Sequence, residues 1–133
     1  MSEKFHPLFK DAELEREFQA NGFLKTGQIS LDAINQLKGL IEELNFDKNT
    51  KFGTTVVLDA PDFEIRHRMK EKVKRIIQPF IEQITYDRTI ISASFLNKLP
   101  IETSFLSPHQ DWTYHNQNEA DSIMGWIPLV DVD

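Results

Sequence analysis

The sequence predicts an α+β fold in which helices come first and strands follow. Residues 1–85 carry apolar side chains at helical spacing, whereas residues 86–133 contain three runs rich in β-branched and aromatic residues. Helices and strands in separate parts of a chain favour an α+β layout, because a parallel α/β sheet requires the two to alternate. A length of 133 residues with 40% apolar content allows a single domain with one core.

The first predicted helix covers residues 11–20. It places Leu14 and Phe18 four positions apart on one face, and Asn21-Gly22 supplies a stop signal. A short extended piece, GFLKTGQI, follows it.

Ser30 can cap a second helix, because its hydroxyl can accept a hydrogen bond from a backbone N–H of the first turn. One apolar stripe supports this helix: Leu31, Ile34, Leu37, Ile41 and Leu44.

Residues 54–59, TTVVLD, are β-branched and are predicted to be extended. Pro61 suits the first turn of a third helix. Pro79 is expected to end or bend that helix, because proline lacks the N–H that the helical ladder needs. The amphipathic stripe of this helix consists of Phe63, Met69, Val73, Ile76, Ile77 and Phe80.

Three strand-like runs make up the second part of the chain. They are residues 88–99, 103–114 and 122–133, and polar or proline-containing turns separate them.

Composition excludes several classes of function. There is no cysteine, so any metal must be bound by histidine and carboxylate. The net charge of −6 argues against nucleic acid and anionic membrane as partners. The charged first residues do not resemble a signal peptide, and no apolar run approaches the roughly 18 residues of a membrane span. We therefore expect a soluble, cytoplasmic protein.

The basic residues of the third predicted helix fall on both flanks of its apolar stripe. They are Arg66, Arg68, Lys70, Lys72, Lys74 and Arg75. Long basic side chains beside a buried stripe usually extend to water, so we interpret them as a solvated face rather than an anion site. His67, on the same helix, has no acidic or histidine neighbour at a useful spacing and is expected at the surface, as is His6.

The pair His109-x-Asp111 lies where a predicted apolar strand ends. Residues two apart on a strand project to the same face, so an imidazole and a carboxylate can reach one point. These are two of the three ligands in the 2-His-1-carboxylate triad that holds non-haem Fe(II). The pair could instead form a hydrogen-bonded His–Asp couple at a strand end.

The surrounding residues resemble the phytanoyl-CoA dioxygenase family. The resemblance is carried by NKLP, SPHQDWTY and WIPLVDVD, and by FQANGFLKTGQISLDAINQLKGLIEEL near the N-terminus, which matches the usual first strand and helix. It covers the chain from about Glu13 onward. Family members are iron(II)- and 2-oxoglutarate-dependent oxygenases, so the resemblance implies N-terminal helices followed by the first strands of a double-stranded β-helix, or jelly-roll.

The resemblance implies that His109 and Asp111 bind iron(II), that 2-oxoglutarate is the cosubstrate, and that the protein hydroxylates a small organic substrate. Asn97 falls near a position that contacts 2-oxoglutarate in relatives, although it could equally be a turn residue before Pro100. Trp126 matches an aromatic residue of the same pocket, although it could equally belong to the core.

Two further aromatic residues beside the motif are candidates for substrate contacts. Trp112 and Tyr114 could face the substrate or close the end of the barrel. His115 departs from the small or acidic residue usual at that point and could compete for the metal, although an exposed position fits it better.

The family pattern breaks after the motif. It requires a second histidine several strands later and an arginine for the far carboxylate of 2-oxoglutarate. The 22 residues after Asp111 contain one histidine, His115, and no arginine. Residues 86–133 are also too few for the roughly eight strands of a jelly-roll. We therefore expect residues 1–133 to be a single, incomplete domain, the N-terminal part of a longer oxygenase and inactive alone.

Two other classes remain open. One is a non-catalytic binding or scaffold module derived from the same fold, which the missing distal histidine and arginine favour if the chain is complete. The other is a metal-binding protein that uses His115 as its third ligand. The sequence does not specify an oligomeric state.

Overall fold

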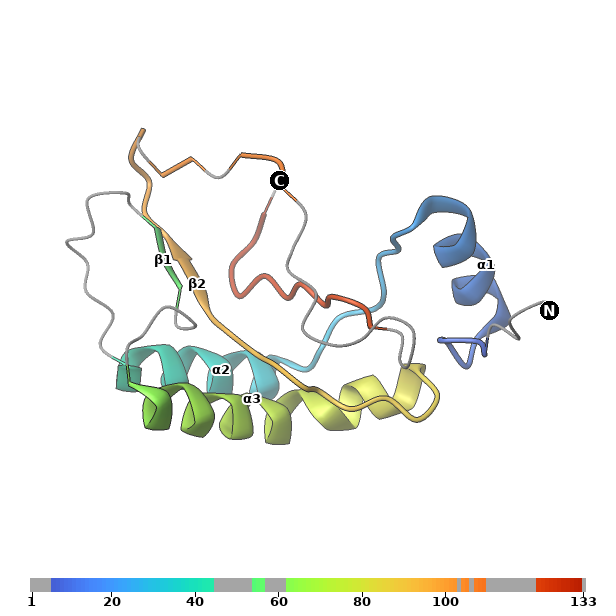
Figure 1. Cartoon of the computed structure of the whole chain (residues 1–133), viewed down its shortest axis with the longest axis horizontal. Coiled ribbons are helices and arrows are strands. Elements are labelled where there is room, and N and C mark those ends of the chain that lie inside the picture. Colours follow the sequence, from blue (N-terminus) through green and yellow to red (C-terminus); the bar gives the residue numbers. More distant parts are fainter. Residues whose placement is uncertain are drawn as a thin grey trace.

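The structure is a computed structural model that describes residues 6–44, 54–56, 62–102, 104–105, 107–109 and 122–132. Its elements in chain order are α1 (Ala12–Asn21), α2 (Leu31–Leu44), β1 (Thr54–Val56), α3 (Phe63–Ile84) and β2 (Leu96–Lys98). Helices α2 and α3 lie side by side, the chain leading into β2 crosses over them, and α1 stands at the far end of α3 (Figure 1).

Helix α1 has a complete cap at each end. The Asp11 carboxylate accepts hydrogen bonds from the backbone N–H groups of Glu13 (2.7 Å) and Leu14 (3.1 Å), and these bonds lower the pKa of Asp11. Gly22 takes the left-handed conformation with φ of 75°, and its N–H donates to the Phe18 carbonyl at 2.8 Å. The helix predicted over residues 11–20 with its stop at Asn21-Gly22 is confirmed.

The side chain of Glu15 ties the segment before α1 to the helix itself. Its Oε2 accepts the backbone N–H groups of Leu8 at 2.8 Å and Phe9 at 2.9 Å, and both of these residues are buried. The ring of Phe9 also meets Phe18 of α1 edge-on, with centroids 5.4 Å apart. The hydrogen bond from Phe9 is the largest cause that lowers the pKa of Glu15 below its usual value.

Replacing Glu15 with glutamine is expected to destabilise the protein at neutral pH by about 1 kcal/mol, because a neutral amide oxygen accepts two N–H groups less well than a carboxylate and the site is partly screened by water. The folded-state pKa is lowered, so this stabilisation is present at pH 7 and is lost as the pH falls from 4.5 through the lowered value. Urea unfolding of wild type and Glu15→Gln at neutral and acidic pH checks this. The difference should vanish in acid, and Glu17→Gln, on the exposed side of α1, should show almost none at either pH.

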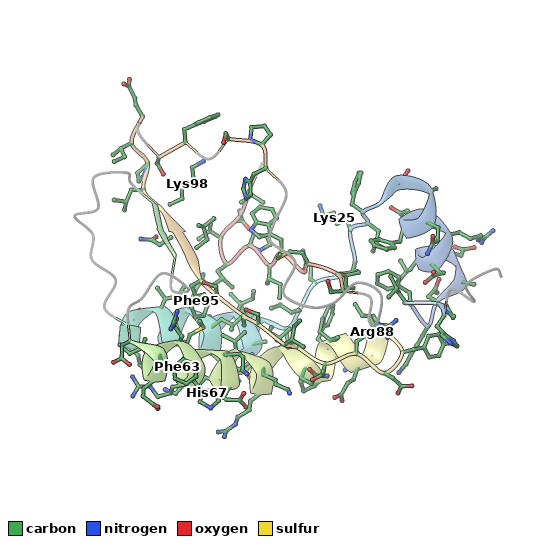
Figure 2. All side chains as sticks on the ribbon, in the orientation of Figure 1. Lys25, Phe63, His67, Arg88, Phe95 and Lys98 are labelled. Atoms are coloured by element: carbon green, nitrogen blue, oxygen red, sulfur yellow. The ribbon has the colours of Figure 1, made fainter. Side chains whose placement is uncertain are left out.

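Helices α2 and α3 form the base of the core. Ser30 caps α2 through its hydroxyl, which accepts the N–H of Ala33 at 3.1 Å, as predicted. The buried cluster consists of Leu37, Leu40, Met69, Ile77 and Phe95, and partly buried Ile41, Val73 and Ile76 extend it. Phe95, just before β2, contributes from above the two helices (Figure 2).

The apolar stripes predicted for α2 and α3 are therefore confirmed in the middle of each helix. The prediction that the first residue of each stripe is buried is wrong. Leu31 and Phe63, the first residues of α2 and α3, are 75% and 65% exposed. Leu40 was not part of the predicted stripe, yet it is buried against α3.

Helix α3 begins after Pro61 and continues past Pro79, and a bend at Pro79 stays a prediction. Asp62 is its N-cap and accepts the N–H of Glu64 at 2.8 Å, so the helix starts after Pro61, which lies outside the described residues. Pro79 does not end the helix, which continues to Ile84. Proline removes the hydrogen bond that its own N–H would donate and crowds the carbonyl four residues earlier, but the apolar stripe on either side holds the helix together.

Strand β2 (Leu96–Lys98) is shorter than the strand-like run predicted over residues 88–99. β1 and β2 pair antiparallel in the register Thr54↔Lys98, Thr55↔Asn97 and Val56↔Leu96. Within the predicted run 88–99 only β2 is a strand, and residues 122–132 contain no strand. An alternating pattern shows which residues suit a strand, but a ladder forms only where a neighbouring strand supplies hydrogen bonds. The jelly-roll implied by the resemblance stays a prediction.

Candidate functional site

His109 lies at the surface in the last described residues before the motif's aspartate. Its Nδ1 is 2.8 Å from the backbone carbonyl oxygen of Ser107. A carbonyl oxygen only accepts hydrogen bonds, so Nδ1 is the donor in this contact. Histidines that bind metals are commonly oriented in this way, by donating their other ring N–H to a backbone carbonyl or a carboxylate.

The remaining residues of the motif lie outside the described residues. They are Asp111, Trp112, Tyr114 and His115. The approach of Asp111 to His109 is therefore still a prediction from their spacing. Among the ranges that the structure describes, no group of three histidine, aspartate or glutamate side chains could hold a metal ion.

Asn97 is the middle residue of β2 and faces Thr55 of β1 in the ladder. Its side chain is half-buried and makes no hydrogen bond to any other described residue. The alternative interpretation of Asn97 as a turn residue is wrong, because Asn97 lies within β2, which continues to Lys98. The backbone that carries the Asn97 amide is held in place by the strand. The contact of this amide with 2-oxoglutarate stays a prediction.

Trp126 is 74% exposed, so the alternative of a core residue is wrong. Its neighbour Ile127 and the next alternate residue, Leu129, pack against the buried cluster instead. Trp126 therefore projects away from the core, where it is available to a ligand or to another surface.

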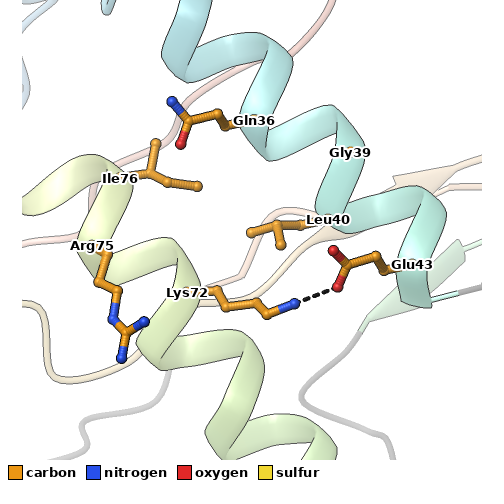
Figure 3. Close-up of a pocket in the computed structure, with 7 residues that line it drawn as sticks. All are labelled: Gln36, Gly39, Leu40, Glu43, Lys72, Arg75 and Ile76. Carbon is orange, nitrogen blue, oxygen red and sulfur yellow. Dashed lines mark hydrogen bonds and ion pairs between the residues drawn. The ribbon is translucent and has the colours of Figure 1, made fainter.

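A groove that the sequence did not predict runs between α2 and α3 (Figure 3). Its volume is about 340 Å³, and it is lined by Gln36, Gly39, Leu40, Glu43, Lys72, Arg75 and Ile76. Lys72 forms an ion pair with Glu43 across it. The sequence feature that could have indicated this groove is Gly39. A glycine inside a helix has no side chain, so it leaves space on the surface of the helix.

Three of the six basic residues of α3 contact neighbouring side chains. Besides the Lys72–Glu43 pair, the Lys70 ammonium is 3.4 Å from the Glu71 carboxylate. The guanidinium of Arg66 lies 5.8 Å from the centre of the Phe63 ring. These contacts support the interpretation of a solvated basic face.

Replacing Arg68 and Lys72 together with glutamine is expected to leave 2-oxoglutarate binding unchanged. Stability should change by no more than about 1 kcal/mol, because the Lys72 ion pair is exposed. Calorimetric titration with 2-oxoglutarate at low and high salt, together with urea unfolding, checks both points. A large and salt-sensitive loss of binding would show that this helix face is an anion site.

Comparison with known proteins gives no match: no protein-family model, no curated protein and no solved structure matches the chain.

None of the described helices combines the length and the apolar composition that crossing a membrane requires.

Proposed function

We propose that this chain provides part of an iron(II)- and 2-oxoglutarate-dependent oxygenase that hydroxylates a small organic substrate. His109 and Asp111 are its two iron ligands. The observation that carries the proposal is the His-x-Asp pair, whose histidine is already oriented by a hydrogen bond from Nδ1 to the Ser107 carbonyl.

The chain's own residues have distinct tasks in this proposal. The Nε2 lone pair of His109 and the carboxylate of Asp111 suit Fe(II), which accepts imidazole and carboxylate ligands. An iron(II) ion held there would supply the chemistry for activating oxygen. Asn97 and Trp126 contact 2-oxoglutarate, and Trp112 and Tyr114 contact the substrate.

Net charge supports a small-molecule substrate rather than nucleic acid or an anionic membrane, because the chain carries −6. A cytoplasmic location belongs to the same proposal.

Residues 1–133 alone are expected to bind iron(II) weakly and to decarboxylate 2-oxoglutarate negligibly. Two protein ligands hold a metal less well than three. The sequence after Asp111 also contains no arginine to pair with the far carboxylate of 2-oxoglutarate, and charge-assisted bidentate pairs are among the stronger polar contacts of a site.

Anaerobic equilibrium dialysis against Fe(II), followed by a succinate assay with 2-oxoglutarate and oxygen, tests the proposal. We expect one weakly bound iron per chain and almost no succinate. Rapid succinate formation by the chain alone would show that a third ligand lies within it, and His115 would be the first candidate to replace.

A non-catalytic binding module derived from the same fold is the second candidate. The exposed position of Trp126 favours it, because a 74% exposed indole offers a contact surface rather than a closed pocket. The same dialysis separates the two functions. No iron uptake above that of a chain lacking His109 would support the module and contradict the oxygenase.

A further inference from the structure

The dipeptide Asn21-Gly22, at the C-terminal end of α1, has the composition that favours a spontaneous chemical change. Asn21 is the only asparagine of the sequence that is followed by glycine. Both residues are exposed, and no hydrogen bond to the described part of the chain holds the Asn21 side chain. A Cβ atom at Gly22 would meet no atom within 4 Å, so water and base have access to this piece of backbone.

Deamidation at such a pair consumes only water and is catalysed by hydroxide. The backbone nitrogen of Gly22 gives its proton to hydroxide and attacks Cγ of Asn21. A bond forms between these two atoms, the bond from Cγ to the side-chain nitrogen breaks, and this nitrogen leaves as ammonia after taking a proton from water. Water then opens the succinimide ring at either carbonyl and leaves aspartate or isoaspartate at position 21. Glycine favours ring closure, because it has no Cβ to crowd the attacking nitrogen.

The cap of α1 restrains the attacking nitrogen. The Gly22 N–H donates to the Phe18 carbonyl at 2.8 Å, and Asn21 is the last residue of the helix. The proton that hydroxide must remove is therefore engaged in a hydrogen bond. The reaction requires the last turn of α1 to open, and local opening is easiest where few contacts hold an element.

Helix α1 is attached to the rest of the described structure at one end of α3 (Figure 1). Two backbone hydrogen bonds join the segment before α1 to the residues around the end of α3. The Lys10 N–H donates to the Ile84 carbonyl at 2.9 Å, and the Tyr86 N–H donates to the Leu8 carbonyl at 3.0 Å.

The last turns of α1 are coupled to this attachment through Phe9. Its ring meets the Phe18 ring edge-on, and its N–H donates to the Glu15 carboxylate at 2.9 Å. Phe18 is also the residue whose carbonyl accepts the capping bond from Gly22. A change at the end of α1 therefore acts on the contact between α1 and the segment that docks on α3.

We propose that Asn21-Gly22 is a site of spontaneous deamidation, that the capped fold of α1 controls its rate, and that its conversion loosens the attachment of α1 to the end of α3. Either product places a carboxylate where the helix has its partial negative charge, and the last turn of α1 has no basic residue to compensate it. Isoaspartate also lengthens the backbone by one carbon atom, which removes the Gly22 N–H from the reach of the Phe18 carbonyl.

Peptide mapping by mass spectrometry during incubation in mildly alkaline buffer measures the conversion of each asparagine. Asn21 should convert faster than Asn35, which is an exposed asparagine of α2 that a residue with a long side chain follows. Asn21→Gln keeps a neutral amide but requires a larger ring, so position 21 of this variant should stay unmodified. Equal rates at Asn21 and Asn35 would overturn the assignment of the site.

A pair of glutamine variants tests the control by the fold. Glu15→Gln weakens the hold on Phe9 and should speed the conversion of Asn21 by up to about fivefold, the factor by which local opening rises. Glu13→Gln is the matched control, because the Glu13 carboxylate is paired with Arg16 at the surface, and its rate should equal that of wild type. A Glu15→Gln rate equal to that of wild type would overturn this control.

Hydrogen exchange of the deamidated protein, separated from the unmodified protein by its added charge, tests the consequence. The amides of Lys10 and Tyr86 should exchange faster than in the unmodified protein, because they form the attachment of α1. The amide of Met69, in the core of α3, should keep its protection. Unchanged exchange at both Lys10 and Tyr86 would overturn the loosening of α1.

Discussion

Replacing either His109 or Asp111 with alanine is expected to lower the affinity for iron(II) by about 100-fold or more. Losing a residue that only orients a ligand typically costs 10- to 100-fold, so losing a ligand should cost at least as much. Since binding by the unaltered chain is expected to be weak, each variant should show almost no iron in anaerobic equilibrium dialysis.

A double replacement and a matched histidine provide the controls. If His109 and Asp111 bind the same ion, the double variant should lose little more affinity for iron(II) than either single variant, because one replacement already disrupts the site. His67→Ala removes an exposed histidine that stacks on Phe63 of α3, and it should leave iron binding intact. Retained binding in both single variants would exclude this pair as the metal site.

Replacing Met69 with alanine is expected to destabilise the protein by about 2–5 kcal/mol. Met69 is 2% exposed, and it belongs to the cluster that joins α3 to Leu37 and Leu40 of α2. The change removes buried apolar atoms and leaves a cavity that two helices can only partly close. Chemical unfolding followed by circular dichroism measures the effect.

Leu31→Ala is the matched control, because it shortens another apolar residue of this helix pair that is 75% exposed. Its effect should lie within about 0.5 kcal/mol. Equal losses in Met69→Ala and Leu31→Ala would contradict the placement of the core between α2 and α3.

The helices could be predicted from the sequence because the signals that define them are local. Asp11 and Ser30 accept hydrogen bonds from the first turns of their helices, and Gly22 ends α1, within a few residues of the patterns that indicate them. Pro79 shows the limit of local reasoning. Its local effect is to break a helix, but packing on both sides of it keeps α3 continuous.

The strands could not be predicted with their correct extent because pairing is not local. The run 88–99 has the composition of a strand throughout, yet only β2 has a described neighbour, the three residues of β1. The groove between α2 and α3 was missed for a related reason. Gly39 is visible in the sequence, but its effect depends on which residues of α3 lie opposite.

The candidate site could be predicted only as far as residue types and spacing allow. A histidine and an aspartate two positions apart define a possible chemistry, and the hydrogen bond from His109 to Ser107 agrees with a ligand role. The exposure of Trp126 could not be predicted, because an aromatic residue in an apolar run suits a core equally well.

A nuclear magnetic resonance titration of the four histidines with Fe(II) under anaerobic conditions tests the proposed iron site directly. Paramagnetic iron broadens the resonances of nearby nuclei. The proposed site predicts that the imidazole signals of His109 broaden first, at substoichiometric iron, while those of His6 and His67 stay sharp. Broadening that begins at His67 or His6, or that affects all four histidines equally, would contradict an iron site at His109 and Asp111.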